Sequence, residues 1–179
     1  MSKLLKRALK SAILPCSLLV TGKFLSVFLL ISVLGIDFSV TNEIQALFSI
    51  QLNIMDPNTA IYINSLSNFI CLLLIAIPTF IIFFRNTLLK DAQNNPKVVV
   101  KLSKLNVLKW VTGPENTLIK VIVWSIFLWI ISGICISQAI SNNIYLWIGI
   151  VAGVLSLLSA FGILRTFDKE TAKIYPEDN

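Results

Sequence analysis

Long apolar runs are the feature that most limits what this chain can fold into. Three runs, residues 61–84, 118–140 and 144–164, can each cross a hydrocarbon core of about 30 Å as a helix of roughly 20 residues. A fourth run, residues 14–36, is long enough only if Lys23 is counted inside it. The chain is 56% hydrophobic, whereas soluble domains are roughly 45–50% apolar. We therefore expect an all-α integral membrane protein with four transmembrane helices.

The basic residues separate two kinds of connecting segment. Every Lys and Arg except Lys23 lies in residues 1–13, 85–117 or 165–179, or is Lys120 at the start of the third span. Residues 37–60 and 141–143 contain none. Because basic residues in short loops stay on the cytoplasmic side, we expect an antiparallel bundle in the cell membrane with both termini in the cytoplasm. The net charge of +6 then reflects topology and attraction to anionic lipid headgroups, and it does not indicate nucleic-acid binding.

The sequence offers no residues for catalytic or cofactor chemistry. The chain has no His, and its three Cys residues fall in three different spans, so a metal site of the usual spacing cannot be built. The four predicted spans contain no Asp or Glu, and the acids elsewhere show no paired arrangement. No phosphate loop, nucleotide fingerprint or family signature is evident. We expect no metal, no cofactor, no catalytic residue and no enzymatic activity.

The N-terminal segment has a second interpretation. Residues 24–36 form a short apolar stretch behind a basic region, and Val33 and Gly35 are small enough to precede a cleavage point, as in a secretory signal. The basic region would be unusually long for a signal, so a retained first span is favoured. Cleavage would remove Lys23 but leave the orientation of the other three spans unchanged.

The outer segment, residues 37–60, is acidic through Asp37, Glu43 and Asp56. Its apolar residues recur at roughly helical spacing, as Ile44, Leu47, Phe48, Leu52 and Met55. Either a short helix lies on the outer interface through this stripe or the segment packs over the ends of the spans.

The cytoplasmic segment, residues 85–117, contains a predicted interfacial helix. Asn95 can cap this helix and Pro96 can begin it, with an end near Gly113. Lys97, Lys101 and Lys104 would share one face, which favours a basic amphipathic helix on the inner leaflet. A partly ordered linker is the alternative, because Lys109 interrupts the apolar stripe.

Lys23 is the residue most out of place in this chain. A central lysine destabilises a membrane helix by about 2.5–3.5 kcal/mol, which snorkelling toward the headgroups reduces. The alternatives to snorkelling are pairing with an acidic partner subunit or attraction of an anion into the bundle. If the first span begins at Leu14, Lys23 lies roughly 14 Å deep. Counting along the other spans then places four hydroxyl residues near that level: Thr79, Ser125, Ser156 and Ser159.

Two asparagines mark a polar face on the second span. Asn64 and Asn68 are spaced i, i+4, so both amides lie on one side of the helix near its outer end. Buried amides in hydrocarbon need partners, so this face should point into the bundle or into water. Interhelical hydrogen bonding is favoured over a polar vestibule for a solute. The candidate intramembrane polar or partner-binding residues are therefore Lys23, Asn64, Asn68, Ser125 and Ser156.

Small residues predict close packing of the last two spans. Gly149 and Gly153 form a G-x-x-x-G pattern, and Gly133 lies in the third span. Helices in lipid associate through close backbone approach at such residues. Because only residues 141–143 separate these spans, packing within the chain is favoured over self-dimerisation.

These features favour a small multi-pass membrane protein with a structural or interaction role, as an accessory subunit of a membrane complex. The expected partners are the lipid bilayer, anionic headgroups at the cytoplasmic face, and a membrane protein or further copies of the chain. The alternative function is a small transporter or channel component, which would have to act as an oligomer because four tightly packed helices enclose little space.

Overall fold

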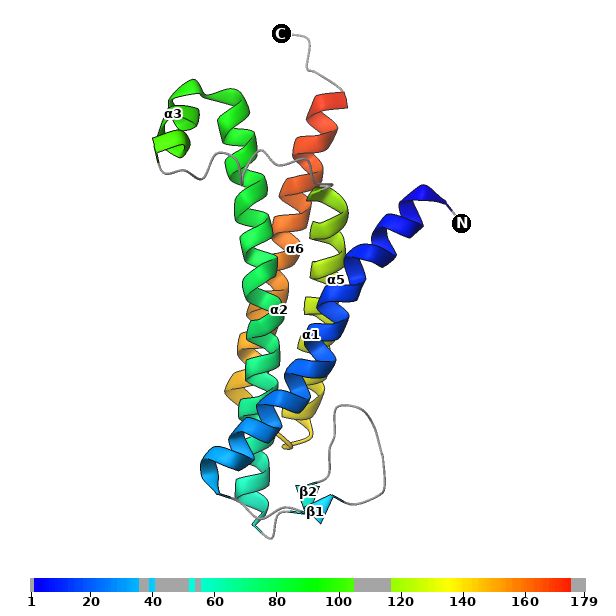
Figure 1. Cartoon of the computed structure of the whole chain (residues 1–179), viewed down its shortest axis with the longest axis vertical. Coiled ribbons are helices and arrows are strands. Elements are labelled where there is room, and N and C mark those ends of the chain that lie inside the picture. Colours follow the sequence, from blue (N-terminus) through cyan, green and yellow to red (C-terminus); the bar gives the residue numbers. More distant parts are fainter. Residues whose placement is uncertain (1, 36–38, 41–51, 54–55, 105–116, 175–179) are drawn as a thin grey trace.

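The computed structural model describes residues 2–35, 39–40, 52–53, 56–104 and 117–174 (Figure 1). These residues form helices α1 (Lys3–Leu34), α2 (Pro57–Asn94), α3 (Pro96–Lys104), α5 (Thr117–Ile140) and α6 (Leu146–Ile174). Two short strands, β1 (Ser39–Val40) and β2 (Leu52–Asn53), pair antiparallel with Val40 opposite Leu52. The helical fold class is confirmed, and the small strand pair was not expected.

Four helical segments are long and apolar enough to cross a membrane. They are Leu5–Leu34, Pro57–Leu88, Ile119–Ile140 and Leu146–Thr166. Each belongs to one of the four predicted spans, so four candidate membrane-spanning helices are confirmed among the described residues. The helices themselves are longer than the spans, because α1 includes most of the basic N-tail and α2 and α6 continue into the connecting or terminal segments beyond them.

Local chemistry explains where α1 begins and ends and where α2 begins. The side chain of Ser2 caps α1 by accepting a hydrogen bond from the Leu5 N–H, and Gly35 ends the helix in the left-handed conformation at φ 61°. Asp56 accepts hydrogen bonds from the backbone N–H groups of Asn58 and Thr59 at the start of α2. Pro57 suits the first helical position because it has no N–H to satisfy.

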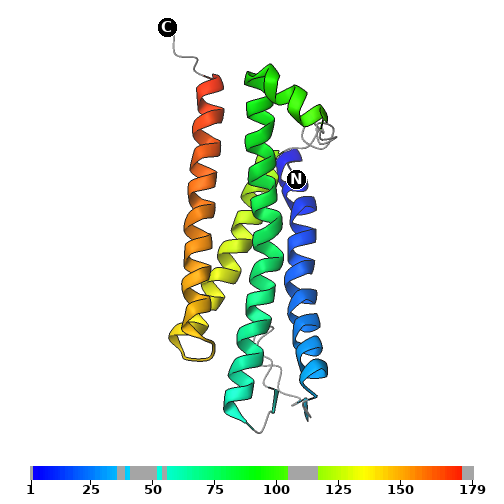
Figure 2. The same ribbon diagram turned by 90° about the vertical axis from the view of Figure 1, so that its left-hand side faces the viewer.

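α2 is the central element of the bundle. It contacts α1, α5 and α6, while α5 and α6 pack against each other and α1 also contacts α5. In Figure 1, α1 crosses the bundle at a slant, and its N-terminal part diverges from the other helices. The N-terminal end of α1, α3 and the C-terminal end of α6 lie toward one end of the molecule (Figures 1 and 2). The strand pair and the α5–α6 turn lie toward the other.

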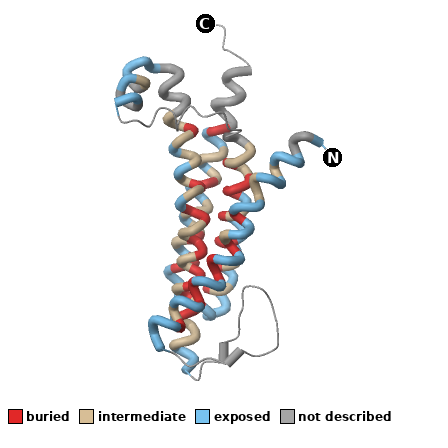
Figure 3. The backbone as a smooth tube through the Cα atoms, in the orientation of Figure 1, coloured by how far each residue is buried: buried red, intermediate tan, exposed pale blue. Residues whose placement is uncertain are grey.

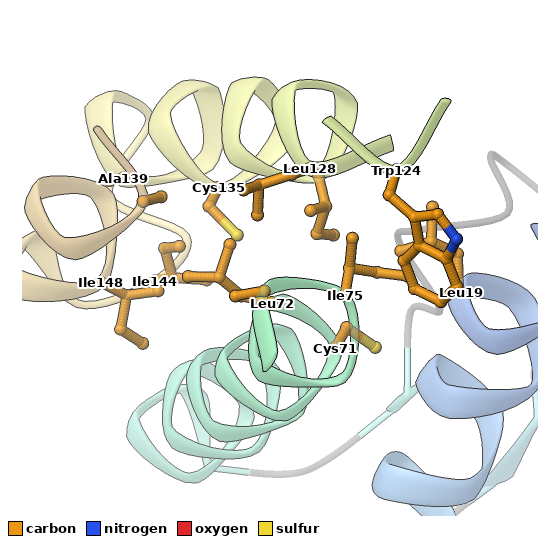
Figure 4. Close-up of a cluster of buried hydrophobic side chains, with 13 residues drawn as sticks. Leu19, Cys71, Leu72, Ile75, Trp124, Leu128, Cys135, Ala139, Ile144 and Ile148 are labelled. Atoms are coloured by element: carbon orange, nitrogen blue, oxygen red, sulfur yellow. The ribbon is translucent and has the colours of Figure 1, made fainter. Parts of the chain in front are cut away.

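The apolar core lies where α2 faces α5 and the start of α6. Leu72 and Ile75 of α2 are fully buried and meet Leu128 and Ile131 of α5 and Ile148 of α6 in one cluster (Figure 4). Figure 3 shows that buried residues follow the inside of the bundle, whereas its outer surface is exposed. Many of the exposed side chains are large and apolar, such as Ile140 and Leu157. This pattern suits helices surrounded by lipid.

Candidate functional site

Lys23 lies inside the bundle with all three ammonium donors engaged. Only 2% of its surface is exposed. Its Nζ lies 2.6 Å from Asn68 Oδ1, 2.8 Å from Ser67 Oγ and 3.0 Å from Asn64 Oδ1. An ammonium group has three N–H donors, so these acceptors on α2 satisfy it completely. The ammonium is therefore bound inside the bundle and is not exposed at its surface.

The acceptors of the ammonium are all neutral. The four candidate membrane-spanning segments contain no Asp or Glu, so the positive charge is stabilised by oriented amide and hydroxyl dipoles within the described bundle. A hydrogen bond to a charged group contributes about 1.5–3 kcal/mol. Three such bonds are large enough to offset the roughly 2.5–3.5 kcal/mol that insertion scales assign to a central lysine.

The acceptors around Lys23 also use their other polar atoms. Asn64 Nδ2 donates to the backbone carbonyl of Asn143 at 3.2 Å. Asn68 Nδ2 donates to Gln138 Oε1 of α5, and Ser67 Oγ donates to the Asn64 carbonyl. The result is one connected network, which we name the lysine cluster: Lys23, Asn64, Ser67, Asn68 and Gln138. It joins α1, α2 and α5 through hydrogen bonds that each member needs in a low-dielectric interior.

The turn between α5 and α6 is fixed to the same part of α2. The Tyr145 N–H donates to Ser65 Oγ at 2.9 Å, beside the contact that Asn64 makes with Asn143. α5 ends in a Schellman motif, in which the Asn143 N–H donates to the Gln138 carbonyl and the Asn142 N–H donates to the Ala139 carbonyl. Asn142 takes the left-handed position at φ 56°, where asparagine is tolerated better than most residues.

The depth count from the sequence gave the wrong partners for Lys23. It placed Thr79, Ser125, Ser156 and Ser159 at the level of the lysine, whereas the ammonium binds residues near the outer end of α2. The count treated the spans as rods of equal length and equal tilt. α1 is instead slanted across the bundle (Figure 1), so a depth counted along α1 does not equal the same depth counted along α2.

The two candidate serines lie apart from the lysine cluster. Ser125 is fully buried in α5, and its hydroxyl makes no hydrogen bond within the described residues. Ser156 is partly buried in α6, and its carbonyl accepts a hydrogen bond from Ser159 Oγ. Ser159 Oγ in turn accepts from Trp129 Nε1 at 2.7 Å, which links α6 to α5. The structure thus brings together Lys23, Asn64 and Asn68 but not the two serines.

Only one of the three glycines predicted for helix packing lies in a close contact. A Cβ atom on Gly149 would come 2.7 Å from the Ala139 Cβ, so this position needs glycine where α5 and α6 cross. Gly133 and Gly153 have open space where a Cβ would be. Two further glycines, Gly22 and Gly162, allow close contacts of α2 with α1 and α6, because a Cβ there would meet Leu74 or Phe83.

Several expectations fall partly outside the described residues. The outer stripe from Ile44 to Phe48 and the end of the predicted interfacial helix near Gly113 are among them. The start of that helix is described as α3, where Asn95 Oδ1 accepts a hydrogen bond from the Lys97 N–H at 3.1 Å. Lys97 and Lys104 are both exposed on it.

The sequence contained signals for the two cluster members that it did not single out. Ser67 follows Asn64 by three residues and therefore lies on the same helix face. Gln138 is an amide within the last turn of an apolar helix, where a partner is needed. Its pairing with Asn68 depends on the α5–α2 crossing, which a single sequence does not reveal. Comparisons with protein-family models, with curated proteins and with solved structures gave no match.

Proposed function

We propose that this chain is a non-catalytic membrane protein with a structural or interaction role, acting as an accessory subunit of a larger membrane complex. The observation that carries the proposal is the closed hydrogen bonding of the lysine cluster. Lys23 donates all three of its N–H groups to acceptors on α2. The side-chain NH2 groups of Asn64 and Asn68 donate in turn to Asn143 and Gln138. Polar groups that satisfy one another fix helix positions and leave little capacity to bind a solute.

The proposed topology is an antiparallel bundle with both termini in the cytoplasm. It is supported by the basic residues of segments 1–13, 85–117 and 165–179 and by their absence from residues 37–60 and 141–143. The membrane is proposed to be the cell membrane. In this orientation the lysine cluster lies in the outer half of the bilayer, and α3 lies at the cytoplasmic face, where anionic headgroups attract its exposed lysines.

The test is purification of the full chain from its native membrane in mild detergent, followed by mass spectrometry of the intact complex. A defined stoichiometric partner is the expected result. A homo-oligomer that supports solute flux in liposomes would overturn the accessory role in favour of the competing function, a transporter or channel component.

Substitutions at two glycine positions can test where a partner binds without disturbing the fold of the chain. Gly153 and Gly133 have open space around them, so Gly153→Leu and Gly133→Leu leave the described packing unchanged. Loss of the partner from either variant, with an intact monomer, locates the contact on that helix. Retention by both variants directs the search for the contact to α1 and α2.

A matched test concerns the lysine itself. Lys23→Met should destabilise the chain without a specific loss of the partner, because the ammonium is bound within the chain. If Lys23→Met instead releases the partner while the monomer stays equally stable, the ammonium serves an intermolecular ion pair and the internal role proposed here is wrong.

A further inference from the structure

α2 and α6 form an open groove near the end of the bundle at which α6 terminates. The groove has a volume of about 390 Å³, within the range of roughly 300–1,000 Å³ that small-molecule sites occupy. Its walls come from one stretch of each helix, with six main contributors: Phe83, Asn86, Leu158, Phe161, Arg165 and Thr166. None of these residues belongs to the lysine cluster.

The two helices run in the same direction along this groove. A Cβ on Gly162 would meet the Phe83 ring at 2.9 Å, and three to four residues further along Asn86 Nδ2 donates to Thr166 Oγ1 at 3.5 Å. Residue numbers therefore increase in the same direction along α2 and α6, which makes the two helices parallel at the groove. Figure 2 shows the two helices side by side at this level.

Both walls change from apolar to polar in the same direction. On α2 the lining passes from Phe80 and Phe83 to Asn86, and on α6 it passes from Leu158 and Phe161 to Arg165 and Thr166. A helix rises by about 1.5 Å per residue, so each wall spans roughly 10 Å from its apolar to its polar end. The polar end coincides with the ends of the two candidate spans, Pro57–Leu88 and Leu146–Thr166, which is where headgroups would lie, and the apolar end lies within the spans.

The polar end of the groove offers one cationic donor. Arg165 is exposed, and no hydrogen bond or ion pair joins it to any side chain that the structure describes, those of residues 167–174 not being among them. The Thr166 and Thr87 hydroxyls donate to the carbonyls of Gly162 and Phe83, so they serve only as acceptors toward a ligand. A guanidinium presents paired donors that match two oxygens of a phosphate group.

We propose that this groove is a binding site for an anionic glycerophospholipid of the inner leaflet. One acyl chain lies along the phenylalanine-lined part, and the headgroup phosphate binds Arg165. The apolar-to-polar gradient, the one charged residue in the lining and the open side of the groove all match the amphipathic form of a phospholipid. The inference rests on the membrane-embedded bundle and, for the choice of leaflet, on the proposed topology, and it is independent of the accessory role.

The test is native mass spectrometry of the purified full chain in the presence of two phospholipids with matched acyl chains. Phosphatidylglycerol is the anionic probe and phosphatidylethanolamine is the zwitterionic one. We expect preferential retention of phosphatidylglycerol, and Arg165→Gln should reduce its preference by roughly 10-fold or more, the effect of losing a hydrogen bond to a charged group. Arg7→Gln on exposed α1 removes the same charge far from the groove and should not change the preference.

A second pair of variants tests the acyl-chain part without changing charge. Leu158 lines the groove and is 52% exposed, whereas its neighbour Leu157 is 74% exposed and lies outside the lining. Leu158→Trp should fill the groove and lower retention of both lipids, while Leu157→Trp should retain both at wild-type levels. Variants are compared only when size-exclusion chromatography shows the same monodisperse species.

Three outcomes would overturn the proposal. One is equal loss of preference in Arg7→Gln and Arg165→Gln, which indicates diffuse charge attraction. Another is unchanged lipid retention in Leu158→Trp, which shows that no chain occupies the groove. The third is displacement of phosphatidylglycerol by millimolar inorganic phosphate, which identifies a free-anion site. Loss of the protein partner in any variant concerns the accessory role alone, because lipid retention is measured separately.

Discussion

The Lys23 ammonium lies 2.6 Å from the side-chain oxygen of Asn68, across 45 residues of sequence. This contact connects α1 to the helix at the centre of the bundle. Because Asn68 also donates to Gln138, displacement of one side chain affects the positions of three helices. Replacing either residue should therefore lower the free energy of unfolding more than the loss of an isolated polar contact would.

The first prediction concerns this pair. Asn68→Leu should lower the free energy of unfolding by about 2–4 kcal/mol, since it leaves a buried ammonium with an unsatisfied donor. Lys23→Met should cost less, because it removes the charge together with its donors. Unfolding by SDS in mixed micelles, followed by circular dichroism, measures both. The double variant should be more stable than Asn68→Leu alone, and strictly additive effects would contradict the direct contact. Ser32→Ala, at an exposed position of α1, is the control.

The second prediction concerns the α5–α6 crossing. Gly149→Ala places a methyl group where Ala139 already lies, so it should destabilise the protein by about 1–3 kcal/mol. Gly153→Ala belongs to the same sequence motif but meets nothing within 4 Å. It should leave the unfolding free energy of the monomer unchanged in the same assay. Equal effects at the two positions would contradict the rotation of α6 in the structure, in which Gly149 but not Gly153 faces α5.

The third prediction concerns the end of α5. Asn142→Val puts a β-branched residue at a left-handed backbone position and should reduce stability by about 1–2 kcal/mol. Asn142→Gly should be neutral or stabilising, because glycine accepts this conformation without strain. Thermal unfolding of both variants distinguishes the two effects. Ser141→Val provides a neighbouring control outside the left-handed position.

The fourth prediction concerns pH. The Thr59 hydroxyl, followed by the Asn58 N–H, holds the pKa of Asp56 below its ordinary value of 3.8. A lowered pKa means that the cap stabilises α2 fully above the unfolded-state pKa, and this contribution is lost as the pH falls through the folded-state value. Thr59→Val should move the pKa of Asp56 upward in a carboxyl-carbon NMR titration. Thr21→Val, which removes a hydroxyl on α1, should not move it.

The fifth prediction concerns orientation in the membrane. In a variant without its native cysteines, Asp56→Cys should react with a membrane-impermeant maleimide applied outside the cell. Ser103→Cys on α3 should react only after the membrane is permeabilised. Both positions are exposed in the structure, so a reversed pattern reflects reversed topology rather than burial.

Hydropathy was sufficient to predict four helices, because long apolar runs leave few alternatives for a chain in lipid. The i, i+4 spacing of Asn64 and Asn68 likewise indicated a shared face that needs partners, and both side chains bind Lys23. The identity of that partner was missed because it depends on the tilt of α1. Tilt arises from packing between helices, such as the contact of Gly22 with Leu74, and hydropathy contains no information about it.

The glycines show a similar limit of sequence analysis. A G-x-x-x-G pattern places two small residues on one helix face, but the rotation of that face toward a neighbour is set by the whole bundle. Gly149 lies in the α5 contact, whereas Gly153 does not. Gly162 has no such pattern around it and still permits α6 to approach the Phe83 ring.

The separation between Lys23 and its acceptors also bears on biogenesis. Ribosomes synthesise α1 first, and Asn64 follows 41 residues later. During that interval the charged side chain has none of its final hydrogen-bond acceptors, so the first helix is poorly suited to leave the translocon by itself. We therefore expect α1 and α2 to leave the translocon together as a hairpin, in which the ammonium already has its acceptors.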